Sequence, residues 1–339
     1  MPVDQSMAVL SDQLLVAAIL AYTVAMFLYA VEYAFGRRGY VSVAARETRV
    51  LVGAGGPPDE VSTAASAPVD PADESPSDGQ ARPRIVLAGR IAVVLTVLGV
   101  AAHAGSLVAR GLSVHRVPWG NMYEFDVAVC LIAVSAYLVL LVRQPLRYLG
   151  AFVMLPVVLL LGLAGTVLYT APGPLVPALD SYWLKIHVSA AILATGIFLV
   201  GFTTSVLYLL RERYERRLSA GRPVRFPTTL GVRLPAADLL ERSTFRIIAF
   251  GFPIWTFAVI AGAIWAEAAW GRYWAWDPKE TWAFIAWVIY AAYLHARSTA
   301  GVRGRAAVGL AVLGWGAMMF NLFGVNMLIS GLHSYAGLN

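Results

Sequence analysis

The sequence predicts an all-α polytopic membrane protein with about eight transmembrane helices. Of its 339 residues, 59% are hydrophobic and only 14% are charged, whereas about a quarter of the residues in an ordinary soluble domain are charged. Several stretches of about 20 residues carry almost no charge, which at 1.5 Å per residue is enough to cross a hydrocarbon core of about 30 Å. Helices are expected because lipid offers backbone polar groups no partner outside the segment itself. The predicted spans are residues 14–35, 86–109, 122–142, 148–169, 187–210, 246–266, 281–297 and 306–329.

The first span is followed by a segment of different composition. It is not expected to be a cleaved signal, because the acidic Asp4 and Asp12 precede it and no small-residue cleavage site follows it. Residues 37–84 are predicted to form a disordered cytoplasmic linker, since their Ala, Pro, Ser, Gly and acidic residues offer too little apolar surface to offset the entropy of ordering. The linker leaves residues 1–36 as an N-terminal helix that is free to be loosely attached, and residues 85–339 as a seven-helix domain.

The distribution of basic residues predicts the orientation. A net charge of +6 in such a chain is expected to report topology and not nucleic-acid binding. Most Lys and Arg residues flank the first, third, fifth and seventh connections, so these loops are expected to be cytoplasmic and both termini to lie on the outer, periplasm-like side. The protein is therefore predicted to be a multi-pass protein of the plasma membrane with its active face outside. The opposite connections carry only Arg110, Arg116, Lys185, Arg272 and Lys279.

The basic loop 211–243 contains three prolines and is expected to lie against the anionic head groups of the lipid bilayer, with partner binding as the alternative. Cys130, the only cysteine, lies in the middle of the third span. It is expected to be a small core residue and not a reactive thiolate.

Tryptophans concentrate in the predicted outer loop 265–282. An aromatic belt at the membrane interface accounts for one or two of them. Five in so short a segment, three of them within 270–277, indicate instead an aromatic platform able to cover a flat apolar ligand. The five are Trp265, Trp270, Trp274, Trp276 and Trp282.

Charged residues in the same loop have structural and functional interpretations. Asp277, Pro278 and Glu280 form a start signal for the seventh span, so Asp277 is expected to be a rigid hinge more than a catalytic acid. Arg272 and Lys279 could pair with ligand carboxylates or could simply be solvated, and the sequence leaves both interpretations open.

Three histidines lie where a ligand could be bound. His187 opens the fifth span and His333 follows the eighth, so both are expected at the outer surface beside the tryptophan loop. Two histidines at one depth beside an aromatic platform are the arrangement expected for bis-imidazole ligation of a haem. His295 lies near the cytoplasmic side, where an ionisable group within the membrane is a functional hypothesis by default. The alternative for His295 is an interfacial residue beside Arg297.

The remaining polar candidates lie in and after the second span. His103 is expected to make a helix-packing hydrogen bond, and His115 to be a solvated loop residue. Glu124 enters the third span just inside the outer surface, where a carboxylate needs a partner, and Arg110 or Arg116 could supply one.

At this point the motifs resemble a known family. The run WGRYWAWDPKETWAFIAW at 270–287 resembles the WWD signature of the haem-handling proteins of cytochrome c biogenesis, and its flanks resemble the CcsA (ResC) branch of system II. The resemblance covers residues 85–339. The matching positions are Trp270, Gly271, Trp274, Trp276 and Asp277 of the signature, two external histidines at His187 and His333, a membrane-embedded histidine at His295, and a further element at Asn121, Tyr123 and Glu124.

The resemblance implies a cytochrome c haem lyase or synthase subunit that takes haem b from the cytoplasmic side, near His295, to the external histidines. There the haem vinyl groups would form thioether bonds with the thiols of a Cys-X-X-Cys-His motif in an apocytochrome c. It further implies a CcsB (ResB) membrane partner and a thioredoxin-like thiol reductant. Two alternatives stay open: haem transport without ligation, and a b-type haem electron-transfer subunit, although the latter usually holds its ligand pairs within facing helices.

Overall fold

The computed structural model describes residues 3–36, 83–143, 146–175, 179–299 and 301–333. Throughout this part of the chain every regular element is a helix. Residues 37–82, which make up almost all of the predicted linker, lie outside the described residues.

All eight predicted spans are helical. Seven helices in the described residues are long and apolar enough to cross a membrane. The eighth, α8, has 21 residues, and its Trp and Tyr residues lower its mean hydropathy. The helices are α1 (Gln5–Phe35), α3 (Pro83–Val114), α4 (Met122–Arg143), α5 (Gly150–Thr166), α6 (Tyr182–Ser219), α7 (Ala237–Trp270), α8 (Pro278–Ser298), α9 (Arg305–Met319) and α10 (Val325–Leu328). A π-helical turn, η5 (Phe320–Gly324), joins the last two, and 3₁₀ turns η2 (Arg147–Leu149) and η4 (Thr228–Arg233) lie in connections.

Several helices continue past their predicted ends, because hydropathy marks only the apolar part of a helix. α6 extends to 38 residues and α7 to 34. Since α7 runs to Trp270, the connection to α8 consists only of residues 271–277 and is shorter than the predicted loop 265–282.

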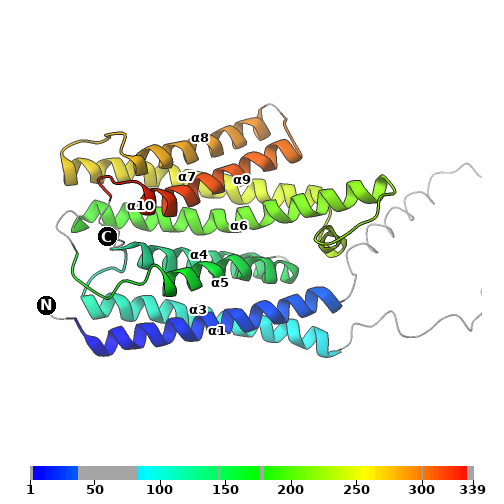
Figure 1. Ribbon diagram of the computed structural model, residues 1–339, viewed down its shortest axis with the longest axis horizontal. Coiled ribbons are helices and arrows are strands. Elements are labelled where there is room, and N and C mark those ends of the chain that lie inside the picture. The colour runs from blue at the N-terminus through cyan, green and yellow to red at the C-terminus, as the bar shows by residue number, and fades with distance from the viewer. Residues whose placement is uncertain (1–2, 37–82, 144–145, 176–178, 300, 334–339) are drawn as a thin grey trace, which may run out of the picture.

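The helices lie side by side in two lobes (Figure 1). The first lobe contains α1, α3, α4 and α5, and the second contains α6 to α10; α4 packs against α6 where they meet. The start of α1, the α7–α8 connection and α10 lie at one end of the bundle (Figure 1). We call this the pocket end, and the opposite end the basic end.

The first helix is tightly packed, contrary to the expectation that the linker leaves it loosely attached. Ser11 donates from Oγ to the Ser106 carbonyl at 2.9 Å, and the Tyr29 hydroxyl lies 3.2 Å from Thr96 Oγ1. The Tyr22 hydroxyl lies 3.3 Å from His103 Nδ1, which confirms the predicted helix-packing hydrogen bond of His103. Buried polar contacts of this kind fix one helix on another where lipid supplies no partner.

The basic loop also contacts protein. The Nη1 of Arg233, in η4, donates to the carbonyls of Tyr33 and Gly36 at 2.7 and 2.8 Å. It thereby places a cation on the carbonyl end of α1, where the helix dipole favours positive charge. This part of the loop therefore belongs to the bundle.

Small residues bring the two lobes together. A Cβ on Gly196 of α6 would lie 2.6 Å from Ile132 and 2.9 Å from the Val129 carbonyl of α4, so only glycine allows this approach. Cys130 is fully buried in the adjoining core, as predicted. This close contact positions the first turn of α4 beside α6 and α7.

Candidate functional site

A pocket opens between the two lobes at the pocket end. Its walls come from the start of α4, from α6 and α7, from the α7–α8 connection, and from α8 and the last helix. His187 and His333, which the sequence predicts as a pair, both line it, and apolar and aromatic side chains supply most of the rest.

His187 is held against α7 by its ring. Its Nδ1 lies 2.8 Å from the Ala258 carbonyl, and because a carbonyl only accepts, Nδ1–H is the donor and the lone pair is on Nε2. The ring stacks on Trp265, with centroids 6.0 Å apart and planes 10° from parallel. A Cβ on Gly262 would lie 2.8 Å from His187 Cε1 and Nδ1, so glycine at this position makes room for the imidazole.

His333 is held by a carboxylate. Its Nδ1 lies 3.0 Å from Asp277 Oδ1, and the neighbouring Leu332 N–H donates to Oδ2 of the same carboxylate at 2.9 Å. The ring meets Trp270 and Trp265 edge-on, with centroids 5.1 and 5.7 Å away. Trp265 therefore contacts both histidines.

Asp277 has two functions, of which the sequence predicts one. It caps α8 in a capping box with Glu280, as expected, and Glu280 also accepts from the Ala275 N–H at 2.9 Å. The second function, orienting His333, is made possible by folding of the chain after α10 onto this cap. Burial opposes ionisation of Asp277, but the hydrogen bonds from His333 and Leu332 outweigh it and hold the pKa of this carboxyl below its ordinary value. Burial lowers the pKa of His333 more than the Asp277 carboxylate raises it, so the pKa of this imidazole lies below its ordinary value.

The loop tryptophans separate into two groups. Gly271 ends α7 in the left-handed conformation at φ 70°, which glycine adopts without strain. Trp270 and Trp274 line the pocket. Trp276 does not: it is 67% exposed and packs with Trp274 and Phe284 outside the pocket.

The two loop cations also separate. Lys279 lines the pocket, and its Nζ donates to Asn326 Oδ1 at 2.7 Å. Arg272 is exposed and is not among the lining residues. Only Lys279 can therefore reach a ligand inside the pocket.

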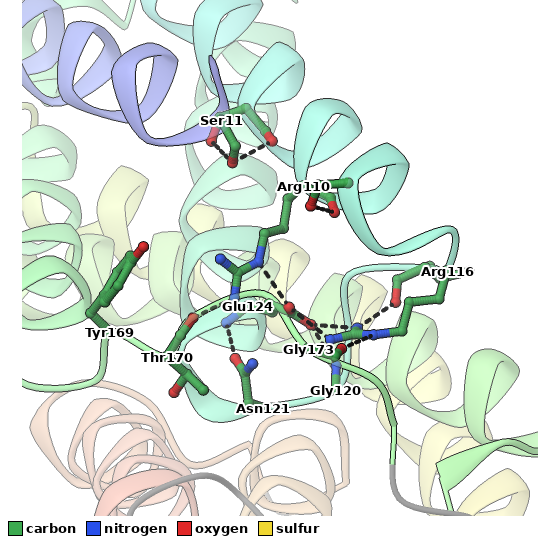
Figure 2. Close-up of polar contacts among 12 residues, drawn as sticks. Ser11, Arg110, Arg116, Gly120, Asn121, Glu124, Tyr169, Thr170 and Gly173 are labelled. Carbon is green, nitrogen blue, oxygen red and sulfur yellow. Dashed lines mark hydrogen bonds and ion pairs between the residues drawn. The ribbon is translucent and has the colours of Figure 1, made fainter. Parts of the chain in front are cut away.

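The Asn121–Glu124 element faces two ways. Asn121 lines the pocket and accepts the Glu124 N–H through Oδ1 at 2.8 Å. Glu124 turns away and is fully buried, with Arg110 Nε at 3.0 Å, Arg116 Nη1 at 2.8 Å and the Gly120 N–H at 2.7 Å (Figure 2). The prediction that one of these arginines pairs with Glu124 is thus confirmed for both.

Tyr123 joins the same buried group. The guanidinium of Arg110 lies 5.1 Å from the centroid of its ring. We call Arg110, Arg116, Gly120, Tyr123 and Glu124 the Glu124 cluster. Its Gly120 also lines the pocket.

Two other histidines lie elsewhere. His295 is exposed in the last turn of α8, towards the basic end, and the fold does not bring it to the pocket. His115 is exposed in the connection before α4, as predicted, with φ 53°.

Four residues that line the pocket have buried polar atoms without a hydrogen-bond partner in the described residues. These atoms are the Nε1 of Trp119, Trp255 and Trp274 and the Oδ1 of Asn321. Of these four residues the sequence singles out only Trp274. The spacing of the other three gives no signal, because each is brought to the pocket from a different segment.

The fold and the site together define a polytopic membrane protein that presents a pocket lined by histidines and tryptophans at one end of its helical bundle. Residues 119–333 match the family described as "Cytochrome C assembly protein". The chain belongs to this family. It is 36% identical over 282 residues to the "Cytochrome c biogenesis protein CcsA" of Gloeobacter violaceus, covering 69% of this chain and 83% of the relative.

Two further relatives carry the same name. The protein of Porphyra purpurea is 33% identical over 288 residues, covering 76% of this chain and 90% of the relative. That of Synechococcus elongatus is 37% identical over 277 residues, with 68% and 83% covered. The chain accordingly has a role in cytochrome c biogenesis in a membrane, a process that involves haem and an apocytochrome.

Proposed function

We propose that this protein holds haem b in the pocket and presents it for covalent attachment to the Cys-X-X-Cys-His motif of an apocytochrome c. The observation that carries the proposal is the meeting of His187 and His333 in one pocket, each with its Nδ1 held by a fixed acceptor. Histidines that bind metals commonly donate from one ring nitrogen to a carbonyl or carboxylate, which orients the other nitrogen towards the metal. The two Nε2 atoms would therefore hold the haem iron when haem is bound.

The surroundings of the two histidines fit a flat, largely apolar ligand. Trp265, Trp270 and Trp274 provide aromatic faces and edges around the pair, and most of the remaining lining is apolar. Lys279 can pair with a haem propionate inside the pocket. Arg272, exposed on the loop, can act only where a ligand or partner approaches from outside.

The reaction joins two thiols of the substrate to the two haem vinyl groups. In each addition an S–H bond breaks, sulfur bonds to one vinyl carbon and hydrogen to the other, and no net electron transfer is needed. The protein supplies orientation, and the haem supplies the reactivity. The chain contributes no thiol of its own, because its single cysteine, Cys130, is fully buried.

The proposed activity has a sidedness and needs other proteins. By the positive-inside rule the pocket end would lie on the outer face of the membrane, which we propose to be the plasma membrane, and the apocytochrome would meet it there. A CcsB (ResB) membrane protein would complete the lyase, and a thioredoxin-like pathway would keep the apocytochrome thiols reduced. His295 would contact haem on its way from the cytoplasmic side.

The test is co-expression with a CcsB-type partner and a reporter apocytochrome, followed by staining of denatured gels for covalent haem. His187→Ala combined with His333→Ala should abolish the stained band and the six-coordinate haem spectrum of the purified protein. His115→Ala, an exposed histidine outside the pocket, is the matched control and should change neither.

The outcomes separate the candidate functions. Unchanged covalent haem in the double variant would refute the ligand assignment. Haem binding that needs both histidines, without any thioether product in the complete system, would favour haem transport or electron transfer over ligation.

A further inference from the structure

The pocket continues past the histidines to a floor that lies deep in the bundle. Thr195, Trp255, Met318 and Asn321 line this floor from three helical segments. Thr195 lies eight residues further along α6 than His187, which places it roughly 12 Å deeper at 1.5 Å per residue. Trp255 precedes Gly262, the residue that contacts His187, by two turns of α7.

Two polar atoms of the floor are buried without a partner in the described residues. Trp255 is 5% exposed and its Nε1 has no acceptor, and Asn321 is 7% exposed and its Oδ1 has no donor. Buried polar groups nearly always find partners, so two exceptions at one place require an explanation. Neighbouring groups are satisfied: Thr195 donates to the Ala191 carbonyl at 2.7 Å, and Trp287 Nε1 donates to Thr256 at 2.8 Å.

The backbone at Asn321 is also unusual. Asn321 lies in η5, the π-helical turn between α9 and α10. Such turns are rare and are frequent at functional sites, because the extra residue alters which side chains face a given direction. Here the turn contains Asn321, whose polar side chain lines the floor of the pocket.

We infer that Trp255 and Asn321 form a subsite for a carboxyl group of the haem, namely one propionate. This inference rests on the proposed function. A carboxyl oxygen accepts from the indole N–H, and the Asn321 amide can offer either Oδ1 to a carboxylic acid or, turned about its terminal torsion, Nδ2–H to a carboxylate. The methyl and vinyl groups and the ring carbons of haem can satisfy neither residue.

The subsite fixes which edge of the macrocycle faces the mouth of the pocket. The propionates and the vinyl groups occupy opposite edges of haem b. A propionate at the floor therefore turns the vinyl edge towards Trp119 and Trp274, where an apocytochrome would arrive, and the second propionate is left for Lys279 on the α8 wall. Orientation of the vinyl edge is what the proposed attachment requires.

The experiment compares iron protoporphyrin IX with its dimethyl ester, in which both propionates are blocked. The purified full-length protein is titrated with each, and the six-coordinate spectrum is followed. The wild type should prefer the free acid, and Trp255→Phe combined with Asn321→Leu should reduce this preference by about tenfold, the value of a lost hydrogen bond to a charged group. Trp287→Phe, whose indole N–H already has a partner, is the control and should keep the full preference.

The possible results of the titrations have different consequences for the propionate subsite and for the proposed function. Equal affinity of the wild type for acid and ester would mean that ordered water fills the floor, and it would overturn the inference while leaving the histidine ligands intact. A preference unchanged in the double variant would overturn it as well. A wild type that binds neither porphyrin would overturn the proposed function and the inference together.

Discussion

The Glu124 cluster and the pocket adjoin at the first turn of α4, where Gly120 belongs to both, and both contain buried polar side chains. In the cluster, the Glu124 carboxylate accepts from Arg110, Arg116 and the Gly120 N–H (Figure 2). Arg110 Nη1 is the one buried polar atom of the cluster that has no hydrogen-bond partner in the described residues. In the pocket, three indole nitrogens and one amide oxygen have no partner in the described residues.

The difference distinguishes structural polarity from polarity that serves a ligand. A buried polar group that is satisfied within the protein contributes to one unique arrangement of helices. A buried polar group that is left unsatisfied costs stability unless water or a ligand completes it. Substitutions in the cluster should therefore change stability, and those in the pocket should change haem binding.

The largest effect is expected at the centre of the cluster. Glu124→Gln removes the only carboxylate that contacts both Arg110 and Arg116 in the described structure and leaves their charges buried, so unfolding should become easier by about 3–5 kcal/mol. Thermal unfolding in detergent measures this. Asp238→Asn, which breaks an exposed pair with Arg242, is the control and should cost less than about 1 kcal/mol. Equal effects of the two substitutions would contradict the structural role of the cluster.

A variant in the pocket should change haem binding, whereas the cluster variant changes stability. Gly262→Ala places a methyl group 2.8 Å from two atoms of the His187 ring, so the imidazole must move. Overpacking of this kind costs about 1–3 kcal/mol, which corresponds to a loss in haem affinity of roughly ten- to a hundredfold. Haem titration with spectral detection measures it. Gly316→Ala in α9, where a Cβ meets nothing within 4 Å, should bind haem normally. An equal loss of haem affinity in this control would mean that the effect of Gly262→Ala does not come from displacement of the His187 ring.

Asp277→Asn tests the support of the second histidine. The amide can still cap α8, but it offers His333 a weaker acceptor than the carboxylate does. Loss of such a supporting partner typically weakens metal binding by about 10- to 100-fold. Haem affinity should fall within this range while the unfolding temperature changes little. A large fall in unfolding temperature with normal haem affinity would mean that Asp277 acts only as a helix cap.

The smallest effect is expected at the contact between α1 and α3. Tyr22→Phe removes the hydroxyl that lies 3.3 Å from His103 Nδ1, between α1 and α3. The unfolding free energy should fall by about 1 kcal/mol, the net value of one hydrogen bond, and haem binding should stay unchanged. A change in the haem spectrum of this variant would show that the contact between α1 and α3 is coupled to the pocket.

Most of the fold follows from local properties of the sequence. All eight spans are predicted by hydropathy, and the burial of Cys130 follows from its place in the middle of the third span. The cap at Asp277 and the pairing of Glu124 with arginine follow from the cost of leaving polar groups without partners. The sequence also predicts His187 and His333 as candidates beside the tryptophan loop, because their positions follow from counting helices. It does not distinguish Trp274, inside the pocket, from Trp276, outside it, since both belong to one motif and differ only in loop conformation.

The helices and the motif that marks the family can be predicted from the sequence, since each depends on residues close together in the chain. The contact of Asp277 with His333 across 56 residues and that of His187 with Ala258 across 71 arise from the packing of whole helices. The same holds for the packing of α1 on α3 and for the meeting of Trp255 and Asn321 in one pocket. These contacts depend on how whole helices pack, and packing is set by side-chain shape between distant segments, which no local pattern encodes.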